Sequence, residues 1–376
     1  MQTTFRAIVE DTKLGHHRAH RDAEETASNF ISKQIACSFL RFLCVSVPPW
    51  WIRFLLSAII QAVIALRVLI FLTFAVAQAL SQPAPQPALP AVLGLFDRYP
   101  LVILAEEHWK RALGDFYVSL VRHPDFPKQA GTLVLECGNS LYQPILDRYE
   151  NGEDVPFEQI SQVWRNTTKV LGWESPIYAN LIAAVREVNR SLPPEKKIRV
   201  IAADSPIDWS QVRDDGDYDQ AFGGDKFFAS VIEREVLAKN RKALVIMGIN
   251  HVTRGGDRRG DPDVTTMIEK YAHHSTYVVL LGGINPNSDP SLRGAEPVFY
   301  PLRGTPLGQL MISSRRAEEA ADAFLYLPHS GELVAPDWDS LPTDKSYFRE
   351  IQRRHLIEFG CPLNIEKWKR MQRPCS

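Results

Sequence analysis

Residues 99–109 read Tyr-Pro-Leu-Val-Ile-Leu-Ala-Glu-Glu-His-Trp, and this stretch decides the fold class. Its first half, residues 101–104, is a continuous run of branched apolar side chains, which is typical of a strand buried on both faces of an α/β sheet. Glu106 and His108 follow where the strand runs out, and their spacing of two projects them to the same side. Because open α/β sheets bind ligands at this edge, the pair is a candidate site. The competing interpretation is that both are solvated loop residues that precede a helix.

A second apolar strand also ends close to a histidine. Residues 243–247 form the strand, and Gly248 and His251 follow it. Glycine permits a tight turn at the end of the strand, so His251 can be aimed back over the edge of the sheet. Two strand ends of this kind favour one shared site over two unrelated solvated loops.

Two further apolar runs end in a carboxylate. Residues 132–136 end at Glu136, and residues 198–204 end at Asp204. A single acidic residue at a strand end is most often only solvated. We nevertheless expect Glu136 to lie beside Glu106, because consecutive parallel strands are often neighbours.

The remaining pattern alternates strands with amphipathic helices. Helices with one apolar face are predicted at residues 110–122, 227–240 and 265–272, and later strands at residues 276–281 and 323–327. Residues 140–190 are rich in aromatic and arginine side chains and are predicted to form a helical insertion after the second strand, which is able to cover a pocket. The sequence therefore predicts an α/β fold with a mixed, largely parallel sheet flanked by helices.

The N-terminal part is unlike the rest of the chain. Residues 54–80 are almost wholly apolar and long enough to span a bilayer, but Arg67 in their middle costs about 2.5–3.5 kcal/mol on insertion scales. Residues 63–79 fit a signal peptide better, with Arg67 as its positive region and small residues at 75–79 as its cleavage site. A signal anchor at residues 54–80 is the alternative. Either interpretation predicts that the folded domain is exported, in the periplasm or outside the cell.

The division of the chain follows from this. Residues 1–62 are then an extended leader or the result of a start site assigned too far upstream, and residues 80–94 are a Pro-rich linker. We expect the folded domain at residues 95–335. A C-terminal helical tail is expected at residues 336–376.

Composition limits the partners of the chain. The 376 residues are 45% hydrophobic, which suffices for a large core, and the net charge of -1 gives no reason to expect nucleic-acid binding. The five cysteines include no Cys-x-x-Cys pair, which excludes a zinc ribbon or a thioredoxin motif. Cys361 and Cys375 are able to pair if the chain is exported, with Cys137 left as a small buried hydrophobe. Nothing indicates an oligomeric state.

The succession of motifs resembles the superfamily that unites erythromycin esterases, ChaN-like haem-binding proteins and Tiki/TraB metalloproteases. The resemblance covers about residues 95–330. One departure is that Ala105 stands where the first motif of the family usually has glycine. The matching residues are Ala105, Glu106, Glu107 and His108, then Glu136, Asp204, and Gly248, Ile249, Asn250 and His251.

The first function that these residues suggest is hydrolysis of an ester, a lactone or a peptide bond in a small molecule or a peptide. Imidazoles and carboxylates that converge on one sheet edge are able to hold zinc, manganese or iron with one open position, and the candidate ligands are Glu106, His108, Asp204 and His251. Without metal, His108 is the general base that activates water and Glu106 orients it. His251 or an arginine then stabilises the oxyanion, and Glu136 belongs to the same catalytic set.

The resemblance to the ChaN-like branch implies an alternative, an exported haem- or metal-binding protein that serves in uptake. Haem requires an axial histidine or tyrosine beside an apolar slot. The candidates are His108, His251 and Tyr142. A catalytically inactive relative that acts as a binding module is the third possibility. If the apolar N-terminal segment is not cleaved, it is also the contact of the chain with a membrane.

Overall fold

The computed structural model describes residues 49–81, 84–255, 261–285, 292, 294–312 and 314–375. The chain divides into two compact units, with the boundary between residues 81 and 82. In the first unit, helix α2 (Pro49–Ser81) contains the predicted signal segment, whereas residues 1–48 of the predicted leader lie outside the described residues. Among the described residues, no helix is both long enough and apolar enough to cross a membrane.

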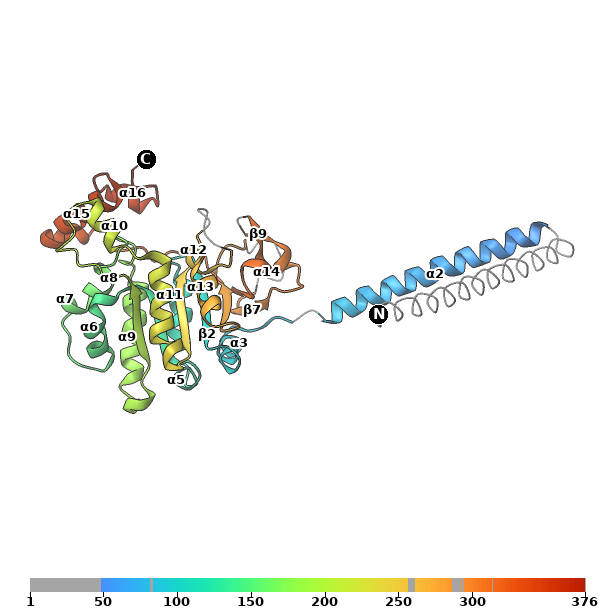
Figure 1. Ribbon diagram of the computed structural model, residues 1–376, viewed down its shortest axis with the longest axis horizontal. Helices are drawn as coiled ribbons and strands as arrows, with labels where there is room; N and C mark the ends of the chain where they lie inside the picture. Colours follow the sequence, from blue (N-terminus) through green and yellow to red (C-terminus); the bar gives the residue numbers. More distant parts are fainter. Residues whose placement is uncertain are drawn as a thin grey trace, which may run out of the picture. The chain divides into compact units, whose positions relative to one another are not determined.

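The second unit is built on an eight-stranded sheet with the order β1-β7-β10-β6-β2-β5-β3-β4. Figure 1 shows the helices that surround this sheet, among them α6, α9, α11 and α13. The strands from β10 to β4 in this order are parallel, whereas β7 and β1 are antiparallel to their neighbours. The prediction of a mixed, largely parallel sheet is confirmed. The strands are β1 (Gln86–Pro87), β2 (Leu101–Glu106), β3 (Thr132–Asn139), β4 (Arg199–Asp204), β5 (Ala243–Gly248), β6 (Thr276–Leu280), β7 (Val298–Pro301) and β10 (Ala323–Tyr326), and β8 (Met311–Ile312) and β9 (Arg315–Arg316) pair separately.

Helices cover both faces of the sheet, which explains why the strands are continuously apolar. Alternate residues of β2 enter two different cores: Val102 and Leu104 pack on the side of α4 and α9, and Leu101 and Ile103 on the side of α11 and α13. The helices on the first side are α3 (Ala88–Gly94), α4 (Arg111–Arg122), α5 (Phe126–Gln129), α6 (Gln143–Glu150), α7 (Phe157–Ile160), α8 (Gln162–Arg165) and α9 (Pro176–Asn189). The second side carries α11 (Gly224–Glu235), α12 (Ile249–Val252), α13 (Val264–Tyr271) and α14 (Ala317–Ala320).

The helical insertion after the second predicted strand is present and contains α6, α7, α8 and α9. The expected adjacency of the first two strands was wrong, because β5 lies between β2 and β3 and pairs with both. After β2, the chain forms β3 and β4 further along the sheet, and β5 then inserts between β2 and β3. Part of the predicted linker also belongs to the domain, since Gln86–Pro87 pair with β7 and the side chains of Val92 and Leu93 in α3 are buried.

The predicted C-terminal tail packs on the domain near α10 (Asp215–Ala221). Its main helix α15 (Lys345–Phe359) starts after Asp344, whose side chain accepts the amide of Tyr347, and ends at Gly360 with a φ of 70°. Helix α16 (Ile365–Lys369) follows. Several contacts join α15 to the helical insertion, and among them the carboxylate of Glu358 accepts the amide of Val170 at 2.9 Å and binds Lys169 at 3.0 Å.

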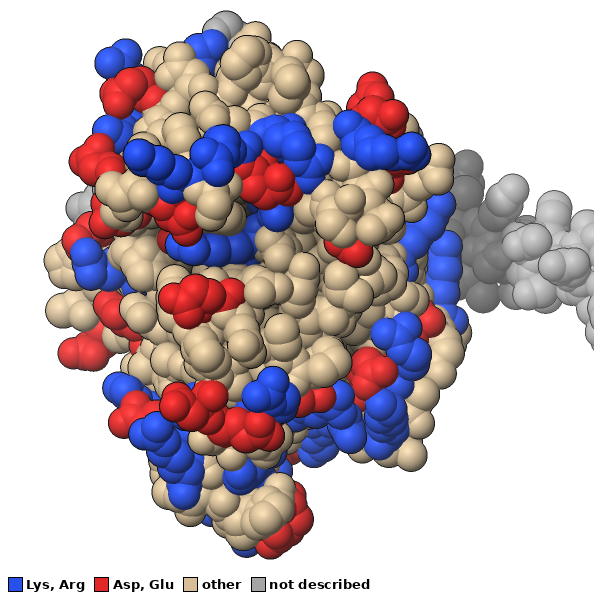
Figure 2. All heavy atoms as spheres, turned by 90° about the vertical axis from the view of Figure 1, so that its left-hand side faces the viewer, with Lys and Arg blue, Asp and Glu red and all other residues tan. Residues whose placement is uncertain are grey.

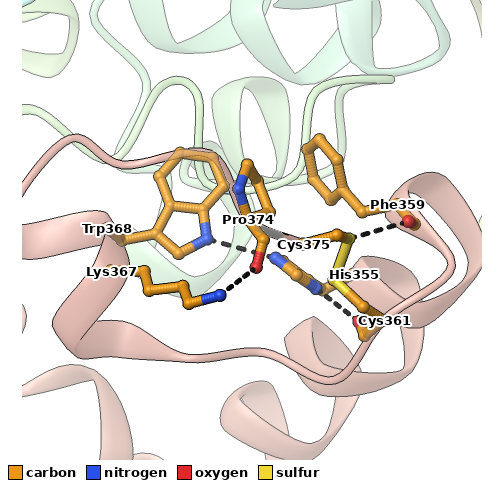
Figure 3. The surroundings of a disulfide bond; sticks show 7 residues. All are labelled: His355, Phe359, Cys361, Lys367, Trp368, Pro374 and Cys375. Atoms are coloured by element: carbon orange, nitrogen blue, oxygen red, sulfur yellow. Dashed lines mark hydrogen bonds between the residues drawn. A yellow bond between two sulfur atoms is a disulfide. The ribbon is translucent and has the colours of Figure 1, made fainter.

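A disulfide between Cys361 and Cys375 closes the end of the chain (Figure 3). The sequence allowed this pair, and Cys137 stays free and buried, as expected. Beneath the bridge, His355 donates from Nδ1 to the carbonyl of Cys361 at 2.9 Å and accepts the Trp368 indole N–H at Nε2 at 3.2 Å. Because Nδ1 donates and Nε2 accepts, His355 is neutral and carries its proton on Nδ1. Burial favours this neutral form by lowering the pKa of His355.

Removal of the bridge is expected to release α16 without unfolding the sheet. A disulfide that closes a loop of this length, with a sequence separation of 14, stabilises by about 3 kcal/mol through chain entropy. In the variant Cys361→Ser/Cys375→Ser, hydrogen exchange should show lost protection in α16 and unchanged protection in β2 and β5. Wild-type protein treated with a reducing agent should behave in the same way. Unchanged protection of α16 in both samples would contradict the expectation.

A second expectation concerns Glu150, the last residue of α6. Its side chain is 4% exposed, and Oε2 accepts the amide of Val200 at 2.7 Å. Burial raises the pKa of this carboxyl to about 8, and the charge of Asp147 acts in the same direction. Because the folded-state pKa lies above the ordinary value of 4.5, Glu150 favours the folded state most at low pH, and that contribution is lost as the pH rises from 4.5 through about 8.

Replacement of Glu150 by glutamine keeps an acceptor for the Val200 amide and removes the ionisation. Between the unfolded-state and folded-state pKa values of Glu150, the free energy of unfolding of the wild type falls by about 1.4 kcal/mol per pH unit. That of the variant does not, because glutamine has no ionisation. The thermal midpoint of Glu150→Gln should therefore exceed that of the wild type by a margin that grows from pH 5 to pH 9. A margin that is independent of pH would show that Glu150 does not titrate in this range.

Candidate functional site

Glu106 is the last residue of β2, and its side chain is 2% exposed. It shares the face of β2 with Val102 and Leu104, so its carboxylate enters the layer between the sheet and helices α4 and α9. Tyr117 of α4 donates its hydroxyl to Oε2 at 2.5 Å, and Tyr178 of α9 donates to Oε1 at 2.7 Å. The carboxylate is thus bound by two helices at once.

His108 lies beside this carboxylate, two residues further along the chain. Its Nδ1 donates to Oε1 of Glu106 at 2.7 Å, and the edge of the Trp173 ring packs against the imidazole with a centroid distance of 4.7 Å. The other nitrogen, Nε2, points to Gly248 at the end of β5: a Cβ on Gly248 would lie 3.0 Å from Nε2 and 3.3 Å from Oε2 of Glu136. Glycine therefore keeps open a small space that His108 and Glu136 both face.

His251 approaches the same space from the other side of the sheet. Its Nδ1 lies 2.5 Å from Oδ1 of Asp225 in the first turn of α11, and its Nε2 lies 3.5 Å from Oε1 of Glu136. The second oxygen of Glu136 accepts the amide of Gly248 at 2.5 Å. Glu136 thereby connects the two histidines, although it is on neither of their strands.

The site consists of two carboxylate–imidazole pairs, Glu106 with His108 and Asp225 with His251. In each pair the carboxylate binds Nδ1, which fixes the tautomer and the orientation of the ring and leaves Nε2 for a reacting group. The side chain of His108 is 37% exposed and that of His251 is 31% exposed, so solvent reaches both rings.

The carboxylates determine the charge of the site. Burial would lower the pKa of His108, but the hydrogen bond and charge of Glu106, together with the charge of Glu136, raise it to about 9. Burial likewise opposes a charged His251, yet Asp225 and Glu136 raise the pKa of that imidazole above its ordinary value. Burial acts to raise the pKa of Glu106, but His108 and the two tyrosine hydroxyls outweigh it and hold that pKa below the usual range. At neutral pH, Glu106 and His108 are therefore an ion pair.

The structure brings Glu106, His108, Glu136 and His251 together, but not Asp204 or Tyr142. Asp204 ends β4, the edge strand of the sheet, and its two oxygens accept the amide and the hydroxyl of Thr168 at 2.5 and 2.8 Å. Burial raises the pKa of Asp204 to about 7. The hydroxyl of Tyr142 accepts a hydrogen bond from the side-chain amide of Asn166 at 2.8 Å.

The expected metal set of Glu106, His108, Asp204 and His251 is therefore not assembled. In the described part of the chain, no group of three or more His, Cys, Asp or Glu side chains has the arrangement of a metal site. Glu106 is unsuited to a metal because both of its oxygens already accept hydrogen bonds from Tyr117, Tyr178 and His108.

Sequence reasoning missed Asp225, Trp173, Tyr117 and Tyr178. The two tyrosines fall at apolar positions of α4 and α9, and both rings are fully buried. The available signal was that a buried tyrosine hydroxyl usually needs a hydrogen-bond partner. Asp225 follows Gly223 and Gly224 directly before the predicted helix, and only the fold shows that this helix end meets His251.

No protein-family model matches this sequence, and no curated protein matches it. Solved structures with a similar chain course do exist, and all have low sequence identity. The type III effector HopBA1 matches with a TM-score of 0.38 and 11% identity over 64% of this chain and 94% of that chain. A Bacillus cereus protein matches with a TM-score of 0.42 and 12% identity over 63% and 91%. ChaN of Campylobacter jejuni, described in a structure with cofacial haem binding, matches with a TM-score of 0.39 and 12% identity over 63% and 91%. The structural neighbours thus include a protein of the ChaN-like branch that the sequence motifs resemble.

Proposed function

We propose that this chain is an exported hydrolase of an ester, lactone or peptide bond, with proton transfer by the two carboxylate-bound histidines. One observation carries the proposal. His108 presents its Nε2 to the space beside Gly248, and Glu136, which faces that space, also lies next to Nε2 of His251. Export is supported by the Cys361–Cys375 bridge, because disulfides persist mainly in oxidising compartments.

The proposed reaction needs one base and one donor. Water attacks the carbonyl carbon while neutral His108 takes its proton at Nε2, and Glu106 stabilises the imidazolium that forms. His251, charged and held by Asp225, donates a hydrogen bond from Nε2 to the carbonyl oxygen, where negative charge develops, and keeps its proton throughout. When the tetrahedral intermediate collapses, the bond to the leaving group breaks and His108 returns its proton to that group.

A cavity of about 360 Å³ at the carboxyl ends of β6 and β10 offers space for the body of a small substrate. Glu107, which lies between the two residues of the first pair, lines this cavity together with Lys110, and the two form an ion pair. Leu281, Ile284 and Phe324 supply apolar parts of the wall. This composition suits a substrate with an apolar portion and a polar group.

Haem or metal binding for uptake remains an alternative that rests on the sequence. Metal coordination by Glu106 or Asp204 would break hydrogen bonds that both of their oxygens accept from the protein, so no step above uses a metal. An absorption spectrum and elemental analysis of the purified chain test this alternative directly. A Soret band that disappears in His108→Ala would replace the hydrolase proposal by haem binding.

The hydrolase proposal predicts that His108→Ala and His251→Ala each lower the rate of ester or lactone hydrolysis. The expected loss for the general base is about 10²–10⁴-fold. The full chain should be screened with p-nitrophenyl esters, lactones and short peptides. His273→Ala is the matched control, because His273 is exposed and lies at the start of β6, away from both pairs. Full activity in both His108→Ala and His251→Ala would refute the mechanism.

The pH dependence of the reaction gives an independent test. His108 has to be neutral to act as the base, so its titration should give kcat/KM a rising limb with a midpoint near pH 9, whereas the requirement for a charged His251 gives a separate falling limb. Glu106→Gln removes the negative charge that raises the pKa of His108, whereas burial still lowers this pKa and the charge of Glu136 still raises it. The rising limb should therefore move from about 9 toward the ordinary value of 6.5.

Histidine NMR on the same variant should report the same lowered pKa for His108. Asp225→Asn is the matched control: it should lower the pKa of His251 and leave the titration of His108 near its wild-type value. If the kinetic limb of Glu106→Gln stays near pH 9 while the NMR pKa falls, then His108 is not the base.

A further inference from the structure

A second cavity lies at the amino ends of β3, β4 and β5, at the opposite edge of the sheet from the histidines. Its volume is about 500 Å³, and its wall comes from the starts of these strands, the end of α6 and the segment before β4. The cationic residues in this wall are Lys196, Lys197, Arg199, Arg241 and Lys242. None of them belongs to the site described above.

These cations have few acidic partners. Arg199 lies 3.9 Å from Asp147, and within the described residues no ion pair is found for the other four. Lys197 and Lys242 bind backbone carbonyls instead, those of Asn151 at 3.1 Å and Phe96 at 2.6 Å. Carbonyl groups leave the positive charge of an ammonium group uncompensated, so the wall of the cavity is electropositive.

The wall also contains three acidic residues, Asp147, Glu150 and Glu195, which do not cancel the charge of its five cations. Glu150 is buried and, with a pKa of about 8 caused chiefly by that burial, is mostly uncharged at neutral pH. Asp147 is already engaged by Gln143 Nε2 at 2.6 Å and by Arg199. On the face drawn in Figure 2, by contrast, basic and acidic side chains are interspersed over the surface. In the wall of the cavity, five cations face only two carboxylates that are charged at neutral pH, Asp147 and Glu195, so positive charge is in excess there in a protein with a net charge of -1.

We propose that this cavity binds a small molecule or headgroup that carries phosphate. Phosphate oxygens accept several charged hydrogen bonds at once, and lysine and arginine groups converging from different elements are the usual donors. The volume is within the range of small-molecule sites and exceeds what a lone ion needs. This binding is independent of the hydrolase proposal. Two sources share the chemistry: a soluble phosphorylated compound and a phospholipid headgroup.

Pyrophosphate is the probe for the cavity, titrated calorimetrically into the full chain at low ionic strength. The wild type should bind it with one-to-one stoichiometry, and the affinity should fall as salt is added. The variant Lys196→Gln/Arg241→Gln should bind at least tenfold more weakly, whereas Lys196→Arg/Arg241→Lys, which keeps both charges, should retain binding. Thermal unfolding of each variant verifies that it is folded.

A matched control distinguishes binding in the cavity from an effect of the overall charge of the protein. Lys270→Gln/Arg303→Gln removes the same two charges from exposed positions outside the cavity and should leave pyrophosphate binding unchanged. An absence of wild-type binding, or an equal loss in the two double variants, would overturn the proposal.

Vesicles distinguish the two sources of phosphate. If the ligand is a headgroup, the wild type should sediment more with vesicles that contain phosphatidylglycerol than with pure phosphatidylcholine vesicles. Pyrophosphate should then compete, and Lys196→Gln/Arg241→Gln should lose the difference. If pyrophosphate binds and this difference is absent, the ligand is a soluble phosphorylated compound.

Discussion

The buried carboxylate of Glu106 is the interaction on which the site depends. An anion removed from water is stable only when its oxygens are hydrogen-bonded or paired with a cation. Here the donors come from α4, α9 and the segment after β2, namely Tyr117, Tyr178 and His108. One carboxylate therefore both binds helices α4 and α9 through the two tyrosines and stabilises the charged form of His108.

The order of the strands explains why two distant motifs meet. Because β5 enters the sheet between β2 and β3, the end of β2 lies beside Gly248, and Glu136 of β3 accepts the amide of that glycine. Helices after β2 and β5 leave on opposite faces of the sheet, so the two histidines approach the carboxyl ends of these strands from opposite sides.

Local patterns predicted most of the fold and about half of the site. Apolar runs located the strands of the sheet, and strand ends located Glu106, His108, Glu136 and His251, because both features depend on short stretches of sequence. Strand order depends instead on long-range packing, and adjacency of consecutive strands is only a tendency, which β5 breaks. Asp204 and Asp225 show the same limit: which face of the sheet each occupies, and which loop it meets, follows from the assembled layers.

The contact of Glu358 with Lys169 and Val170 has a practical consequence. The loop that it holds also contains Gly172, whose carbonyl accepts the Trp109 indole N–H at 2.8 Å, and Trp173, which packs against His108. The end of the chain thus braces the wall of the histidine site from more than 180 residues away in sequence. A substitution that removes the Glu358 carboxylate would therefore loosen one wall of the histidine site without changing either histidine.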